Sequence, residues 1–407
     1  MKKSILVMSI ACISNATHLH AAALERSGQS ILPFLQSGNY FEAGLTSIDP
    51  KVSGAIKPEY NKGGLTAAAN MPTGNIAENY YFPHAAIKFQ LNENFSLGFI
   101  YDQPFGAKAS YPIGKYPAYT FKGESTSAEV KSENLSAIVG YQPNQNWNIY
   151  AGAVAQTVEG NAHLRGASYS WAIYDMDAPK TTGYGWLAGA AFSIPEIALR
   201  AAVTYRSEID HNISTSENIT FPTGVGATGP IYGPQMVFKE KSTITTPRSI
   251  NVDLQSGIMK DTVAFANLRW VDWSSFTVTP LGLYNLVTLP STGKGVDLAA
   301  YYDDQFSASI GVGHQFSEKW AGSVNAGWDS GAGNLVSTLG PTEGYYSAGL
   351  GIKYNPAPNY DISFGAKYFW LGDAKAQSGF DFATEKYDAI YTNNKAIAYG
   401  LKIGYKF

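Results

Sequence analysis

Aromatic and aliphatic side chains are concentrated in two segments between predicted strands, where they could bind a hydrophobic molecule. A pocket for such a ligand needs apolar walls and a few polar groups that orient it. These side chains could instead pack loop against loop or lie at a lipid interface. The first segment contains Leu164, Tyr169, Trp171, Ile173 and Tyr174, and the second contains Phe221, Ile231, Tyr232, Met236, Val237 and Phe238.

Charged side chains form a second candidate group. They lie on the face of each predicted strand that is opposite to its apolar face. We interpret them as a structural network of ion pairs rather than as a ligand site, because charge is tolerated on the inner face of a barrel. We expect Glu208 to be the partner of Arg206. The inward group is Arg200, Arg206, Asp253, Arg269 and Lys367.

Catalytic and metal-binding chemistry has little support. A hydrolytic site needs a serine, a histidine and a polar third residue, but the histidines beyond the N-terminal region have no recognisable serine context and form no close pair for zinc. No glycine-rich phosphate loop follows a strand and opens a helix. We therefore expect no enzyme, no cofactor and no metal. These histidines are His84, His163, His211 and His314.

The N-terminus predicts a cleaved secretory signal peptide over residues 1–23. Lys2 and Lys3 form a basic start, residues 5–13 are an apolar run, and three alanines at 21–23 offer a cleavage site. The protein is therefore expected to leave the cytoplasm.

Cys12 raises the alternative of a lipoprotein, but Ser9 stands where a leucine is usual. Cleavage near residue 23 would remove this only cysteine, together with two of the 29 basic residues. The formal charge would then change from −3 to −5, with 27 basic against 32 acidic residues. No basic excess points to nucleic acid as a partner.

The C-terminal segment Lys395–Phe407 alternates between large apolar residues and small or charged ones. Its apolar phase runs from Ile397 through Tyr399 to Phe407. A period of two is that of a β-strand with one apolar face. A strand of a soluble sandwich would give the same pattern, but the terminal Phe and the tyrosines near both ends favour the last strand of a membrane barrel.

Short polar links each join two alternating segments, which predicts a series of hairpins. A first strand at Tyr40–Ile48 and the C-terminal strand raise the total to about fourteen, within the range of membrane barrels. The predicted hairpins are Tyr81–Leu91 with Phe95–Tyr101, Ala128–Gln142 with Trp147–Val158, Tyr184–Phe192 with Ile197–Ser207, Arg248–Ile258 with Val263–Trp273, Phe306–Phe316 with Trp320–Trp328, and Tyr346–Tyr354 with Tyr360–Tyr368.

The other connections are long, and this alternation is typical of outer-membrane barrels, with turns in the periplasm and loops outside. Beyond the leader no stretch has the roughly 18 apolar residues of a membrane helix. We predict an all-β fold, a transmembrane antiparallel β-barrel over residues 39–407. The predicted loops lie near residues 49–80, 102–127, 159–183, 208–247, 274–305, 329–345 and 369–394.

Several short runs are similar to the FadL family of transporters for hydrocarbons and long-chain fatty acids. They are Thr204–Glu208, Trp270–Phe276, Asp304 at the opening of a strand, and the aromatic C-terminus. The resemblance covers nearly the whole chain beyond the leader. It implies a monomeric barrel with an N-terminal hatch in its lumen, and a kinked third strand that opens a hole through which ligand passes sideways into the outer membrane.

The third predicted strand fits this resemblance. Residues 95–101 alternate cleanly and are followed by Pro104, Phe105 and Gly106. Proline inside a strand marks an edge, a bulge or the end of the strand. The strand could therefore simply stop here, but the resemblance favours a lateral opening at these three residues.

The sequence also departs from the family. The hatch would be short, with only residues 24–38 before the first strand, and it lacks the usual Asn-Pro-Ala turn. Fatty-acid transporters of the family often carry a lysine just before the residue that matches Asp304, but this chain has Asp303. An uncharged hydrocarbon is therefore also open as a ligand. Arg165 lies close to where the family has a pocket arginine.

The leading hypothesis is passive import of a long-chain fatty acid or hydrocarbon across the outer membrane of a Gram-negative bacterium. The alternatives are a general porin for small polar solutes and an adhesin that acts through its loops. We expect a monomer that contacts outer-membrane lipid and engages the barrel assembly machinery through its C-terminal strand. The candidate ligand-binding residues are Phe105, Arg165, Trp171, Tyr174, Phe221, Tyr232 and Phe238.

Overall fold

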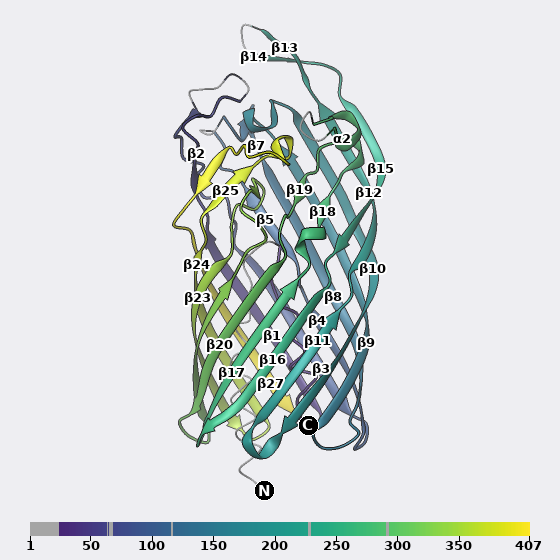
Figure 1. Ribbon diagram of the computed structural model, residues 1–407, viewed down its shortest axis with the longest axis vertical. Coiled ribbons are helices and arrows are strands. Elements are labelled where there is room, and N and C mark those ends of the chain that lie inside the picture. The colour runs from purple at the N-terminus through teal and green to yellow at the C-terminus, as the bar shows by residue number, and fades with distance from the viewer. Residues whose placement is uncertain (1–23, 63, 65–67, 115–116, 227–228, 290–292) are drawn as a thin grey trace.

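The chain folds into a closed, antiparallel β-barrel whose strands are tilted around a common axis (Figure 1). The computed structural model describes residues 24–62, 64, 68–114, 117–226, 229–289 and 293–407. The predicted signal peptide, residues 1–23, lies outside the described residues.

Within the described residues, seventeen strand segments form the barrel sheet. They fill fourteen positions, because three positions are each made of two successive segments. In order, the positions are β1 (Tyr40–Lys51), β3 (Tyr80–Gln90), β4 (Phe95–Asp102) with β5 (Gly106–Ser110), β8 (Ser127–Tyr141), β9 (Trp147–Leu164), β10 (Ile173–Ile194), β11 (Leu199–Arg206) with β12 (Ile209–Thr220), β15 (Met236–Thr246) with β16 (Ser249–Met259), β17 (Thr262–Val271), β20 (Gln305–Gln315), β21 (Trp320–Asp329), β23 (Tyr345–Ala357), β24 (Tyr360–Leu371) and β27 (Lys395–Lys406).

The first and last strands close the barrel. β1 pairs with β27 along its whole length, from Tyr40 opposite Lys406 to Lys51 opposite Lys395, and its other edge pairs with β3. A closed barrel leaves no long strand edge without a partner, which a membrane-spanning sheet requires. The predicted fold class, an antiparallel barrel of about fourteen strands, is confirmed.

Side chains alternate between the two faces of the wall, as predicted. On β20, Phe306 and Ile310 are exposed on the outside, whereas Ser307 and Gln315 are buried in the lumen. On β27 the small and charged phase is inside, with Lys402 buried. The outward phase of this last strand carries Tyr399, Leu401, Ile403, Tyr405 and Phe407.

Two segments predicted as loops, 159–183 and 208–247, consist mainly of strand, so that part of the prediction is wrong. β12 pairs with β15 from Ile209 opposite Thr246 to Ile219 opposite Met236, and β9 and β10 extend beyond their predicted ends. The outward residues of β12, such as Asp210, are exposed and polar. This part of the wall rises beyond the apolar belt, so its strands lack the apolar alternation that marks a membrane strand.

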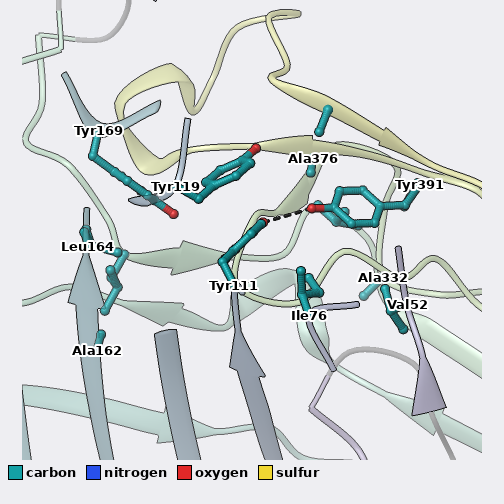
Figure 2. Packing of buried hydrophobic residues seen from close by; sticks show 14 of the residues in the cluster. Val52, Ile76, Tyr111, Tyr119, Ala162, Leu164, Tyr169, Ala332, Ala376 and Tyr391 are labelled. Carbon is teal, nitrogen blue, oxygen red and sulfur yellow. Dashed lines mark hydrogen bonds between the residues drawn. The ribbon is translucent and has the colours of Figure 1, made fainter. Parts of the chain in front are cut away.

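Connections at the outer end pack on one another and form a cap. Figure 2 shows its buried tyrosines: the rings of Tyr111 and Tyr119 are stacked with centroids 4.0 Å apart, and the hydroxyls of Tyr111 and Tyr391 are 2.9 Å apart. The cap holds a four-stranded sheet of β2 (Gly54–Ile56), β26 (Ala389–Tyr391), β25 (Ala374–Gln377) and β22 (Val336–Ser337).

The remaining elements are short. No helix among the described residues is long and apolar enough to cross a membrane. The short elements are β6 (Thr120–Phe121), β7 (Glu124–Ser125), β13 (Pro222–Gly226), β14 (Gly229–Tyr232), β18 (Thr277–Val278), β19 (Ala299–Ala300), helix α2 (Leu281–Leu286), and 3₁₀ turns at Ala167–Tyr169, Pro195–Ile197, Trp273–Ser275 and Gly379–Asp381.

Residues 24–39 lie in contact with the inner face of the barrel. Phe34 is buried, with its ring centroid 5.8 Å from that of Tyr150, and a Cβ at Gly98 would lie only 2.5 Å from the Phe34 ring. Lys88 Nζ donates a hydrogen bond of 2.6 Å to the carbonyl oxygen of Gln36. The barrel wall thus provides space at Gly98 and a hydrogen-bond donor at Lys88 where the N-terminal segment contacts it.

Candidate functional site

The third strand of the barrel is interrupted between β4 and β5. Asp102 pairs with Asn134 of β8, and Gly106 pairs with Lys131. Between these two pairs the third strand contains four residue steps, whereas β8 contains three. One additional residue in a strand makes a bulge, and Pro104 has no N–H to donate to a neighbour.

The same interruption separates the third strand from β3. The ladder between them ends where Ala85 faces Tyr101, and the two segments meet again at a bridge between Ala77 and Ala109. No ladder pair joins these parts of the described chain between the two points. We call the gap between residues 79–84 and 102–107 the wall window.

The N-terminal segment occupies the inner side of the wall window. Arg26 N–H donates to the carbonyl oxygen of Pro104 over 2.7 Å, and Gly106 N–H donates to that of Leu24 over 2.7 Å. The guanidinium carbon of Arg26 lies 4.2 Å from the centre of the Tyr80 ring. The interrupted strand thus gains backbone partners from the N-terminus in place of those it lacks on β3.

An apolar cavity of about 90 Å³, the inner cavity, lies beside the interrupted strand on the lumen side. This space exceeds the roughly 10–15 Å³ that one water needs, and an apolar cavity of this kind favours an apolar guest. Its aromatic wall is continuous, since the Trp273 ring lies 5.5 Å from Phe105 and 5.1 Å from Tyr301. Its lining includes Leu24, Phe105, Val130, Met176, Trp273 and Tyr301.

Two further cavities lie next to this region along the third strand. A middle cavity shares Ala107, Leu339 and Gly340 with the inner cavity. An outer cavity of about 270 Å³ shares Tyr80 and Lys108 with the middle one. The three cavities therefore adjoin one another around the third strand, from the lumen to the wall window.

A titratable carboxyl lies in the loop between β22 and β23, close to the cavity lining at Leu339 and Gly340. Burial raises the pKa of Glu343 to about 7, and the nearby charges of Asp329 and Asp303 act in the same direction. The N–H of Gly333, 3.2 Å from Glu343 Oε1, opposes this shift of the pKa. This side chain is therefore poised to change charge near neutral pH.

Of the ligand-binding candidates predicted from the sequence, Phe105 lines the inner cavity and Arg165 does not. Phe105 is buried, and its N–H donates to Ser132 Oγ over 2.8 Å. Arg165 is also buried, but its guanidinium donates to Glu124 Oε2 over 2.6 Å and to Asp175 Oδ1 over 2.7 Å. Its hydrogen-bonding groups are thus directed at the protein itself.

The other candidates lie in or against the outer cap. The hydroxyl of Tyr232 donates to the carbonyl oxygen of Trp171 over 2.8 Å, and Tyr174 donates to Glu217 over 3.1 Å. Phe221 and Phe238 are partly buried against the same apolar cluster. None of these side chains lines the inner cavity, so the structure brings Phe105 alone of the seven candidates to it.

The predicted charge network is placed only partly as expected. Arg200, Arg206, Asp253, Arg269 and Lys367 are buried on the lumen side, but Glu208 is exposed and no ion pair joins it to Arg206 among the described residues. Glu208 follows the end of β11, outside the inward phase. The lumen ion pairs of the described residues include Arg269 with Glu25, Lys402 with Glu42 and Lys353 with Asp361.

Several cavity residues were missed from the sequence. Trp273 lies in the run Trp270–Phe276, which carried the family resemblance and could have marked it as a pocket residue. Leu24 and Arg26 gave no signal, because their position depends on where the N-terminal segment returns along the lumen. Among the described residues, no group of three or more His, Cys, Asp or Glu side chains could hold a metal ion.

Comparisons with known proteins agree with this architecture. A family model described as outer membrane protein transport protein (OMPP1/FadL/TodX) matches residues 30–407. A FadL homologue from Pseudomonas aeruginosa superposes with a TM-score of 0.70 at 14% identity, over 97% of this chain and 94% of that one. No curated protein sequence matches the chain.

Two toluene transporters are also similar in structure. For TodX from Pseudomonas putida the TM-score is 0.63 at 13% identity, over 97% of this chain and 98% of that one. For TbuX from Ralstonia pickettii it is 0.60 at 12% identity, over 97% and 98%. At these identities the likeness shows the fold.

Proposed function

We propose that this chain, which belongs to the OMPP1/FadL/TodX family of outer membrane transport proteins, lets small hydrophobic molecules leave its lumen through the wall window. The observation that carries the proposal is the apolar inner cavity beside the interrupted third strand, together with two neighbouring cavities that share lining residues with one another along this strand. A ligand captured at the outer end would enter the inner cavity and then diffuse sideways into the outer leaflet.

The driving force is the partition of an apolar chain out of water, which is worth about 0.8 kcal/mol per buried methylene. No energy source is needed, because the destination is also apolar. Long-chain fatty acids and hydrocarbons are the substrate classes that suit an apolar cavity of this kind. We further propose that the protein acts as a monomer in the outer membrane, where the barrel assembly machinery inserts it through β27, and that it performs no catalysis.

Filling the inner cavity tests the proposal. Ala128 of β8 lines the cavity, so Ala128→Phe should occupy it, while Ala137→Phe puts the same side chain on the opposite face of the same strand. Binding of pyrene, an uncharged hydrocarbon, to the purified barrel is measured by fluorescence. We expect Ala128→Phe to weaken binding at least about tenfold, the loss expected when roughly 1.4 kcal/mol of apolar contact is removed, and Ala137→Phe to bind as the wild type does.

Equal binding by both variants would contradict the proposal. Both must first be shown to be folded, by the heat-sensitive gel mobility of intact barrels. A folded Ala128→Phe variant that still binds pyrene normally would move the ligand site away from the inner cavity.

A further inference from the structure

Arg26 is a buried cation without a carboxylate partner among the described residues. Only 5% of its surface is exposed, and its Nε has no hydrogen-bond partner. Two other buried arginines are paired, Arg269 with Glu25 and Arg165 with Glu124. Buried Arg206, on the lumen side, resembles Arg26 in that its Nη1 has no hydrogen-bond partner. Burial of a guanidinium without an anion is unfavourable unless a ligand or another group supplies the charge.

The wall is shaped to admit this guanidinium. The guanidinium lies directly against Gly106, where a Cβ would be 2.4 Å from Arg26 Cζ, so the absence of a side chain at 106 leaves room for it in this position. On another side the Tyr80 ring lies under the guanidinium at 4.2 Å, an arrangement favourable for a cation. The interrupted strand and β3 thus hold the charge of Arg26 inside the wall window.

Arg26 lies between an apolar and a polar environment. Leu24, two residues earlier, lines the apolar inner cavity, whereas Arg26 lines the outer cavity. The other cations of the outer cavity already have partners: Lys108 lies 3.0 Å from Glu78, Lys131 lies 3.0 Å from Glu129, and Lys180 pairs with Glu133. Arg26 is therefore the cation of this cavity that forms no ion pair within the described chain. The carboxylates of Glu129 and Glu159 also line the cavity, and the charge of Glu129 acts on Arg26 without a direct contact.

We propose that Arg26 binds the carboxylate of a long-chain fatty acid at the wall window while the alkyl chain of the ligand lies along the apolar cavities. This proposal rests on the proposed function and deepens it by naming an anionic, amphipathic ligand. A guanidinium binds a carboxylate through charge-assisted hydrogen bonds, often two in parallel. A hydrocarbon would leave the charge of Arg26 without a partner, so the site favours the acid over the alkane.

The test compares oleate with methyl oleate, which differ only in the charge of the head group. Binding to the purified full-length barrel in a non-ionic detergent is measured by displacement of pyrene. We expect Arg26→Gln to bind oleate roughly 10- to 100-fold more weakly, the loss of a charged hydrogen bond, and to bind methyl oleate as the wild type does. Arg26→Lys, which keeps the charge, should retain most of the affinity for oleate.

Lys260→Gln is the matched control, because it removes a cation whose side chain is 93% exposed in the turn between β16 and β17. Unchanged oleate binding by Arg26→Gln would overturn the proposal, as would an equal loss of both ligands, which would make Arg26 a structural plug. These results are distinct from failure of the proposed function, in which the wild type itself binds neither oleate, methyl oleate nor pyrene.

Discussion

At the scale of single residues, Phe105 connects the barrel wall with the inner cavity. Its backbone belongs to the interrupted third strand, where it forms a bridge with Glu25, and its ring packs edge-on against Trp273. Ser132 holds the backbone from the β8 side through hydrogen bonds to both N–H and C=O. The position of the ring is thus fixed by the strand on one side and by the N-terminal segment on the other.

Arg165 is expected to stabilise the folded barrel. Arg165→Ala would remove hydrogen bonds to Glu124 and Asp175 and would leave the carbonyls of Leu164 and Tyr174 without this donor. We expect the free energy of unfolding to fall by about 1–3 kcal/mol, measured by urea unfolding in lipid vesicles.

Arg248→Ala is the control for this measurement, since Arg248 is half-exposed and pairs with Asp272 at 2.8 Å, and a solvent-exposed ion pair contributes little to stability. Normal stability of Arg165→Ala combined with a tenfold loss of oleate affinity would instead support the ligand contact that the family resemblance implies for Arg165.

At the scale of elements, the loop between β22 and β23 ties the cap to the cavities. The hydroxyl of Tyr111 donates to the carbonyl oxygen of Thr338 over 2.8 Å, and Tyr169 bonds the Thr338 side chain at 2.7 Å. Leu339 and Gly340, the next residues, line the inner and middle cavities. A change in this loop would therefore alter the lining of both cavities.

Glu343 should make this loop sensitive to pH. Its pKa in the folded protein is about 7, above the ordinary value of 4.5, so the fold favours the neutral carboxyl. The stability it contributes is complete below pH 4.5 and is lost as the pH rises through 7. Hydrogen exchange of loop amides, corrected for the intrinsic rate, should show protection that falls over this window.

Glu343→Gln should remove this pH dependence and keep the loop protected above pH 7. Glu385→Gln, at an exposed position in another outer loop, should behave as the wild type does. Loop protection that falls equally in Glu343→Gln and in the wild type would show that another group controls the loop.

Strands could be predicted from the sequence where the membrane imposes an alternation of apolar and polar side chains. The C-terminal strand and the β20–β21 hairpin could be recognised because lipid outside and polar side chains inside force strict alternation. β12 and β15 could not, since above the apolar belt residues such as Asn212 face water and carry no apolar signal. The interruption at Pro104 was visible as a local feature, but the contact of Arg26 with it joins residues far apart in the sequence.

At the scale of the whole molecule, we propose that the N-terminal segment blocks simple flow along the barrel axis. A lumen of this size needs either water or a plug. Residues 24–39 bury Ile31 and Phe34 against the wall, and Asn251 Nδ2 donates to the carbonyl oxygen of Gly28 over 2.9 Å. The N-terminal segment thus fills space that would be an aqueous channel in a general porin.

This filling predicts little ion current. The wild type should show no stepwise conductance in planar lipid bilayers, whereas a variant that lacks residues 24–36 should show steps, because the lumen would then hold water. A variant that lacks residues 222–226, the exposed strand β13, should stay silent. Conductance steps in the wild type would favour the general porin.

The central claim is that ligand leaves through the wall window, and deletion of Pro104 tests it most directly. Without this residue β4 and β5 would advance in step with β8 as one continuous strand, while deletion of Gly224 in the β13–β14 hairpin is the matched control. The measurement is uptake of oleate by cells that depend on this protein, with folding of each variant checked by heat-sensitive gel mobility. We predict that the folded Pro104 deletion loses uptake and the Gly224 deletion keeps it; normal uptake by a folded Pro104 deletion would contradict passage through the wall.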